Sequence, residues 1–173
     1  MVQIPEKDII AAAGKGMDAF LDLFYQRLLD SVGGTLDAQT MPLLTGEQIT
    51  LLAYHMLREE VMDGGFIQLI HNGLGPFIFL NPFAKAMRLW GERQDTEVLH
   101  EFSRLIYSGR KLYEQHAEAL TRPCTDEEFM ALYEQYPAFD DLDDAFVESE
   151  EDITAAIAHY VDDHLPLFAE VVK

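Results

Sequence analysis

Hydrophobic residues recur every three or four positions along most of the chain, a spacing that predicts helices with one buried face. In residues 8–29 these positions fit one amphipathic helix, with Gly14 and Gly16 in its first turns and Gly33-Gly34 after its end. No alternating strand pattern spans more than a few residues. The sequence therefore predicts an all-α protein of about seven or eight helices.

Local signals mark where several of these helices begin and end. Three capping boxes are expected to open helices: Thr45 with Gln48, Thr125 with Glu128, and Ser149 with Asp152. Four other boundaries are expected: an end at Asp63-Gly64-Gly65, a start at Asn81-Pro82, an end at Gly91 and a start at Thr96. The last helix should end before Pro166.

The length of 173 residues predicts one helical domain over residues 1–173. Hydrophobic residues make up 49% of the chain, which is ordinary for a globular protein. The formal net charge is −19, and so large a negative charge opposes contact with nucleic acid or with anionic membranes. Basic partners are expected instead.

Cysteine content and the N-terminus bear on the compartment. Cys124 is the single cysteine, so an intrachain disulfide is impossible. The first ten residues lack the basic segment and the apolar core of a signal peptide, and no apolar run reaches the length of a membrane span. A cytoplasmic location is expected.

The negative charge is concentrated near the C-terminus. Residues 123–173 contain 15 acidic residues and a single basic one, Lys173. The segment FDDLDDAFVESEED, residues 139–152, carries eight carboxylates and neither Lys nor Arg. Three explanations are possible for such a segment: disorder, cation binding, or presentation of charge to a basic partner.

Metal sites have little support. Three residue pairs have spacings worth testing, Glu97 with His100, His55 with Glu59, and His159 with His164, but none has a further ligand in sequence. A calcium loop starting at Asp141 would place Ala145 and Phe146 where a ligand and a glycine are required. Surface or capping histidines are the preferred interpretation, and neither a metal nor a cofactor is expected.

Catalytic motifs are equally scarce. Cys124 precedes an expected helix N-terminus, which favours the thiolate, but no His lies nearby in sequence. The sequence has no G-x-S-x-G, and Asp63-Gly64-Gly65-Phe66 lacks the lysine and the spacing of a phosphate-binding loop. We therefore predict that the protein is not an enzyme.

Apolar residues within the acidic segment argue against disorder. Phe139, Leu142 and Phe146 recur at helical intervals, and Ile153, Ile157 and Tyr160 continue the pattern, so the segment should be pinned to the core. The carboxylates should then project outward about 5–6 Å apart, a density comparable to that of DNA phosphates. The candidate partner-binding residues are Asp140, Asp141, Asp143, Asp144, Glu148, Glu150, Glu151 and Asp152.

Two segments resemble the motifs of a bacterial family of DNA-mimic proteins. VMDGGFIQLIHNGLG resembles the family's G-G-F motif, and FDDLDDAFVESEEDITAAIAHYVDDHLPLF resembles its acidic C-terminal F-D-x-L-D-x-x-F motif. The resemblance implies an all-helical dimer that binds a helix-turn-helix transcription regulator and blocks its DNA binding. It implies structural roles for Gly64, Gly65, Phe66, Gln68 and Asn72, and contact roles for Asp140, Asp141, Asp143 and Asp144.

The leading hypothesis is a non-enzymatic inhibitor that occupies the DNA-binding surface of a basic protein, without binding nucleic acid or membranes itself. An immunity protein that neutralises a cationic toxin is the alternative, because charge alone does not separate the two. An enzyme whose site is assembled from distant residues is a third hypothesis. A homodimer is expected from the resemblance and from the apolar stretch Phe77 to Leu80, which is more apolar surface than one core is expected to bury.

Overall fold

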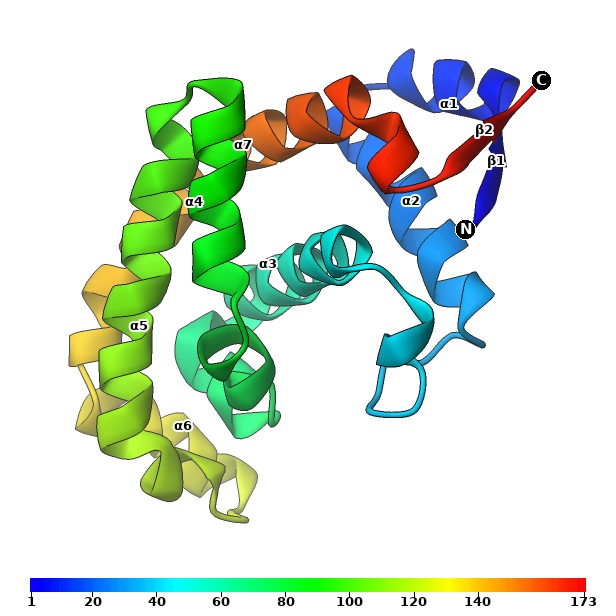
Figure 1. Cartoon of the computed structure of the whole chain (residues 1–173). Helices are drawn as coiled ribbons and strands as arrows, with labels where there is room; N and C mark the ends of the chain where they lie inside the picture. The colour runs from blue at the N-terminus through cyan, green and yellow to red at the C-terminus, as the bar shows by residue number, and fades with distance from the viewer. The chain divides into compact units, whose positions relative to one another are not determined.

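The computed structural model describes residues 1–173 and contains seven α-helices, which confirms the all-α fold class (Figure 1). The helices are α1 (Glu6–Ala13), α2 (Met17–Ser31), α3 (Gly46–His71), α4 (Phe83–Gln94), α5 (Glu97–Thr121), α6 (Asp126–Gln135) and α7 (Ala138–Asp163). Short helical turns lie at η1 (Met41–Leu43), η2 (Pro76–Leu80) and η3 (Leu165–Leu167), and two strands at β1 (Gln3–Pro5) and β2 (Glu170–Val172).

Backbone contacts divide the chain into two compact units. The first unit contains residues 1–55 and 154–173, and the second contains residues 56–153. The chain passes from one unit to the other within α3 and again within α7. The single-domain organisation expected from the length stays a prediction. No helix combines the length and the hydropathy that a membrane span requires.

Strands β1 and β2, in the first unit, were not expected from the sequence. They pair in parallel, with Gln3 opposite Glu170 and Pro5 opposite Val172, and so join the two ends of the chain (Figure 1). Each strand is three residues long, too short for an alternating pattern to be recognised.

The helices of the first unit bury large apolar side chains and pair their few buried polar groups. Phe24 of α2 and Leu51 of α3 are fully buried. The hydroxyls of Tyr54 and Thr154 lie 2.7 Å apart, and the amide of Gln48 donates to the Phe168 carbonyl at 2.8 Å. Gln48 also completes the predicted capping box, because its backbone N–H donates to the Thr45 hydroxyl oxygen at 3.2 Å.

The single helix predicted over residues 8–29 is wrong, because the chain breaks between α1 and α2. Gly16 has φ 119°, a conformation outside the helical region that a residue with a side chain rarely adopts. The apolar periodicity continues across the break, so periodicity alone suggested one helix.

Aromatic side chains form the core of the second unit. Phe66 packs 6.2 Å from Phe79 and 6.4 Å from Phe146, measured between ring centroids. Phe102 of α5 lies 5.9 Å from Phe146, so residues from α3, α5 and α7 meet in one cluster. These four rings are at most 2% exposed, and their burial supplies much of the hydrophobic stabilisation of this unit.

Two predicted boundaries of α4 are wrong. Gly91 lies inside the helix, which continues to Gln94. A Cβ at Gly91 would lie 3.2 Å from the Leu99 Cβ, so glycine permits close packing of α4 on α5. The Asn81 side chain donates to the Phe77 carbonyl instead of capping α4.

The expected start of a helix at Ser149 is also wrong, because α7 is continuous from Ala138 to Asp163. A capping-box pattern has no orphan backbone groups to satisfy inside a helix that already extends in both directions. The capping box at Thr125 and Glu128 is confirmed at the start of α6, and the N-cap at Thr96 is confirmed at the start of α5.

We predict that Phe146→Ala lowers the free energy of unfolding by about 3–5 kcal/mol, because the ring is fully buried and its removal leaves a cavity. Urea denaturation followed by far-UV circular dichroism measures the change. Val147→Ala is the matched control, since Val147 is 51% exposed on the same helix and should change stability by less than about 0.5 kcal/mol. Equal effects of the two substitutions would contradict this packing.

Candidate functional site: an acidic helix face

Residues 139–152 form an ordered part of α7 packed on the core of the second unit, as predicted. Phe139 and Phe146 are fully buried, and Leu142 is 7% exposed. These side chains share one face of the helix and fix its rotation about its own axis. The opposite face is therefore directed to solvent.

Six of the eight predicted acidic residues lie on that solvent face, and we call this set the acidic stripe. At 3.6 residues per turn, the six occupy a sector of about 120° around the helix. Each of them is exposed: Asp140, Asp141, Asp144, Glu148, Glu151 and Asp152.

The acidic stripe has no compensating positive charge. Arg58, Arg88, Arg104, Arg110 and Arg122 of the second unit pair with acids outside the stripe, and no ion pair joins a residue of the stripe. Carboxylates three or four residues apart on a helix repel one another. Packing of the buried face of α7 therefore offsets the repulsion among the carboxylates of the stripe.

Asp143 does not project outward as predicted. It is half-buried, and its carboxylate accepts a hydrogen bond from the Phe66 backbone N–H at 2.8 Å. Burial raises the pKa of Asp143 from 3.8 to about 6; the hydrogen bond from Phe66 opposes this rise, and the charges of Asp140 and Asp144 add to it.

Glu150 is the second correction, because it is 7% exposed and turned toward the protein. Its carboxylate lies 2.6 Å from the Arg58 guanidinium of α3. A buried carboxylate requires such a partner, since an isolated charge is costly to remove from water. Glu150 thus holds α7 to α3 within the second unit and is not part of the stripe.

The G-G-F segment forms a kink within α3, and its structural role is supported. Gly65 has φ 75°, and a Cβ there would collide with the Asp143 carboxylate. The Tyr133 hydroxyl of α6 donates to the Gly64 carbonyl at 2.7 Å. Side chains of α6 and α7 therefore satisfy backbone groups that the kink exposes.

Beyond the kink, Gln68 of α3 and Asn72 just after its end hold two further acids, Glu60 and Asp63. The Gln68 amide donates to Glu60 at 3.0 Å and to Asp63 at 2.8 Å, and the Asn72 amide donates to Glu60 at 3.0 Å. Gln68 and Asn72 thus position carboxylates, which supports their structural role. Gln68 lies eight residues from Glu60 and Asn72 lies twelve, both multiples of the i, i+4 spacing of one helix face, and this was the available signal.

The candidate metal ligands are placed in ordinary structural environments. The His55 ring packs at a tilt against Tyr25 with ring centroids 4.2 Å apart, and the His164 ring stacks on Tyr160 at 4.3 Å. Glu97 lies 3.8 Å from Arg104. No three His, Cys, Asp or Glu side chains come together in a way that could hold a metal ion. Cys124 is exposed.

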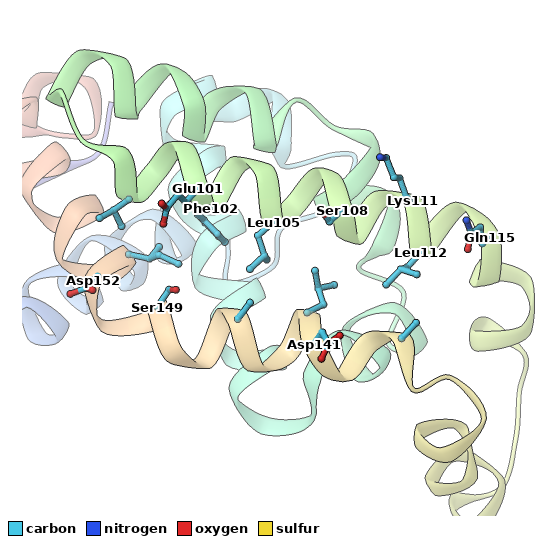
Figure 2. A pocket seen from close by; sticks show the side chains of 15 residues that line it. Glu101, Phe102, Leu105, Ser108, Lys111, Leu112, Gln115, Asp141, Ser149 and Asp152 are labelled. Atoms are coloured by element: carbon cyan, nitrogen blue, oxygen red, sulfur yellow. The ribbon is translucent and has the colours of Figure 1, made fainter.

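An apolar groove of about 670 Å³ lies beside the acidic stripe, between α5 and α7 (Figure 2). Leu105 and Leu112 of α5 and Ala145 of α7 are among its lining residues, and Asp141 and Asp152 of the stripe also line it. The groove was missed because it requires two helices to be neighbours. The seven-residue spacing of Val98, Leu105 and Leu112 was the one signal of a second apolar face on α5.

The fold and this surface define an acidic, all-helical protein whose exposed charge is arranged along one helix. The profile of a family described as DMP19-like protein matches residues 42–164, the region that contains α3 to α7. The chain therefore belongs to the DMP19-like protein family.

A curated relative supports the same assignment. The chain is 31% identical over 134 residues to the DNA mimic protein DMP19 of Neisseria meningitidis serogroup B (strain ATCC BAA-335 / MC58). The matched region covers 77% of this chain and 77% of the relative. The region matched by the family profile contains the whole first motif and residues 139–164 of the second, and in the structure the two motifs meet where Asp143 accepts a hydrogen bond from Phe66.

We predict that Asp143→Asn stabilises the protein relative to the wild type as pH rises. A raised folded-state pKa means that the contribution of Asp143 is fully present below pH 3.8 and is lost as pH rises through about 6. Asparagine does not titrate and keeps an oxygen for the Phe66 N–H. The difference in unfolding free energy should grow by about 1–2 kcal/mol between about pH 4 and pH 7.5, after discounting for partial exposure.

Urea titrations of both proteins at the two pH values measure this difference. Asp144→Asn is the control, because Asp144 is exposed on the stripe one residue away. A difference between Asp143→Asn and wild type that stays constant with pH would contradict the assignment.

Proposed function

We propose that this protein is a DNA mimic that binds a basic DNA-binding protein, a helix-turn-helix transcription regulator, and blocks its access to DNA. Family membership and the name of the curated relative support a DNA-mimic role. The regulator as partner follows from the sequence resemblance. The acidic stripe is the surface that we assign to the contact.

The linear charge density of the stripe is the observation that carries this proposal. Asp140 and Asp152 are twelve residues apart on α7, which corresponds to roughly 18 Å along a helix. Six charges over that length amount to one charge per ~3 Å, close to the ~3.4 Å of one DNA strand. A surface shaped to read phosphates would therefore meet a similar series of charges on α7.

The rigidity of the stripe strengthens the argument. Regulators of this class dock through hydrogen bonds and charges to the DNA backbone, which fix their register on the duplex. Substitute charges must be held at defined positions to exploit those contacts. Three interactions hold the stripe in place: the core packing of α7, the hydrogen bond from the Phe66 N–H to Asp143, and the Arg58–Glu150 ion pair.

The proposed contact set differs from the one expected from sequence. Asp143 and Glu150 are removed because each is committed to an interaction within the protein. Neutralising them would test stability and not recognition. The contact residues that we propose are Asp140, Asp141, Asp144, Glu148, Glu151 and Asp152.

A homodimer is proposed as well, on the strength of the family resemblance. The apolar stretch Phe77 to Leu80 supports a dimer less than the sequence suggested, because Ile78 and Phe79 are buried within the chain itself. Leu80 remains 53% exposed. We predict a dimeric mass by sedimentation equilibrium at micromolar concentration; a strictly monomeric mass there would refute the dimer.

We predict that removing four charges from the stripe weakens binding to the regulator. The variant combines Asp140→Asn, Asp141→Asn, Asp144→Asn and Glu148→Gln. The association rate should fall, since long-range attraction steers encounter, while the helical content is kept. Wild-type affinity should also fall as salt rises, but less steeply than for operator DNA, because separate carboxylates hold no condensed counterion layer.

The control removes the same number of charges elsewhere, with Glu6→Gln, Asp22→Asn, Asp30→Asn and Asp162→Asn, all at exposed positions. Both variants have equal net charge, so a difference between them reports the stripe itself. Pull-down from the native host supplies the regulator, and a gel shift with its operator duplex tests exclusion. A ternary complex with DNA, or a toxin as the captured partner, would refute the DNA-mimic proposal; a toxin would favour the immunity-protein alternative.

A further inference from the structure

The groove between α5 and α7 is formed by two antiparallel helices that touch only along one side. Phe102 packs on Phe146 at 5.9 Å, and His116 lies 6.4 Å from Phe139 at the other end of the contact. Residue numbers rise along one helix as they fall along the other. The side of this contact that carries Leu105 and Leu112 is open, as Figure 2 shows.

The two walls of the groove differ in the size of the side chains that form them. Val98, Leu105 and Leu112 form the α5 wall, are half-buried, and recur every seven residues. Ala145 and Ser149 form the centre of the α7 wall. The small side chains at the centre of the α7 wall, between Leu142 and Ile153, leave a depression opposite the larger α5 side chains, which an apolar side chain of a partner could fill.

Charge is distributed unequally on the two rims. The α7 rim carries Asp141 and Asp152, which belong to the acidic stripe, so that the groove and the stripe are continuous. The α5 rim carries Glu101 and Lys111, which offset one another, and Lys111 points away from α7 (Figure 2). Only the α7 rim therefore calls for positive charge on whatever occupies the groove.

We propose that the groove receives an amphipathic α-helix of the basic partner. Its apolar residues would contact Leu105, Leu112 and Ala145, and Lys or Arg along one flank would face the acidic stripe. The walls extend from Val98 to Gln115 on α5, roughly 25 Å, enough for about four to five turns of helix. This inference rests on the proposed function and specifies the chemistry of the partner.

A partner helix in the groove would make the salt dependence of binding to this protein differ from that of binding to DNA. A DNA backbone offers phosphates but no apolar groove, so salt removes most of the affinity of a non-specific complex. Burial of leucine side chains is not screened by salt. Binding to this protein therefore has a salt-resistant part that comes from the groove, in addition to the salt-sensitive part that comes from the stripe.

Two synthetic peptides of about 18 residues test the inference with the full-length protein. The first carries leucines at helical i, i+4 and i+7 positions with lysines along one flank; the second has the same composition in scrambled order. Isothermal titration calorimetry gives the affinities. The amphipathic peptide should bind about tenfold more tightly than the scrambled one, and the ratio should widen as salt rises.

Two variants of the groove check where the peptide binds. Leu112→Gln removes part of the apolar wall, and Ala145→Leu fills the depression from the opposite side; each should abolish the preference for the amphipathic peptide. Leu89→Gln is the matched control, because Leu89 is a partly exposed leucine of α4 outside the groove. Circular dichroism and urea denaturation establish that each variant is folded.

The outcomes separate this inference from the proposed function. Equal binding of the two peptides, or an unchanged preference in folded Leu112→Gln and Ala145→Leu, overturns the groove inference and leaves the stripe proposal standing. If the fourfold stripe variant binds both peptides as tightly as the wild type does, the result counts against the stripe itself. If Leu112→Gln converts a dimer into a monomer while Leu89→Gln does not, a second copy occupies the groove and the inference is overturned.

Discussion

The hydrogen bond from the Phe66 N–H to Asp143 is the interaction on which the arrangement of the second unit depends. Gly64 and Gly65 interrupt α3, and an interrupted helix leaves backbone groups without partners. Asp143 satisfies one of them from α7, and Tyr133 satisfies another from α6. The bond to Asp143 ties one acid of α7 inward and so reinforces the rotation that the buried Phe139, Leu142 and Phe146 give the helix, with six other acids facing solvent.

The carboxylates of the acidic segment thus have two opposite roles, one inside the protein and one at its surface. Asp143 and Glu150 are retained inside, where each has a donor or a cation to balance it. The stripe residues have none and depend on water for solvation. Sequence cannot assign these roles from composition, since inward and outward acids are separated by single positions, as Asp143 and Asp144 are.

Helical periodicity predicted the buried face of α7 and the fold class, because the apolar spacing is a direct record of which side faces the core. It could not detect the break at Gly16, since periodicity continues on both sides of it. It also could not show that Ser149 lies within a continuous helix, because capping signals are only local. The groove escaped prediction for a different reason: it exists only when α5 and α7 are adjacent, which is a tertiary fact.

The pairing of β1 with β2 has a mechanical consequence. The strands are parallel, and the chain enters at the start of β1 and leaves at the end of β2. Tension applied to the two termini therefore pulls the strands past one another lengthwise, so that all their hydrogen bonds bear the load together. An antiparallel pair in the same place would open one bond at a time. This three-residue pairing should therefore resist mechanical extension more strongly than its small contribution to equilibrium stability would suggest.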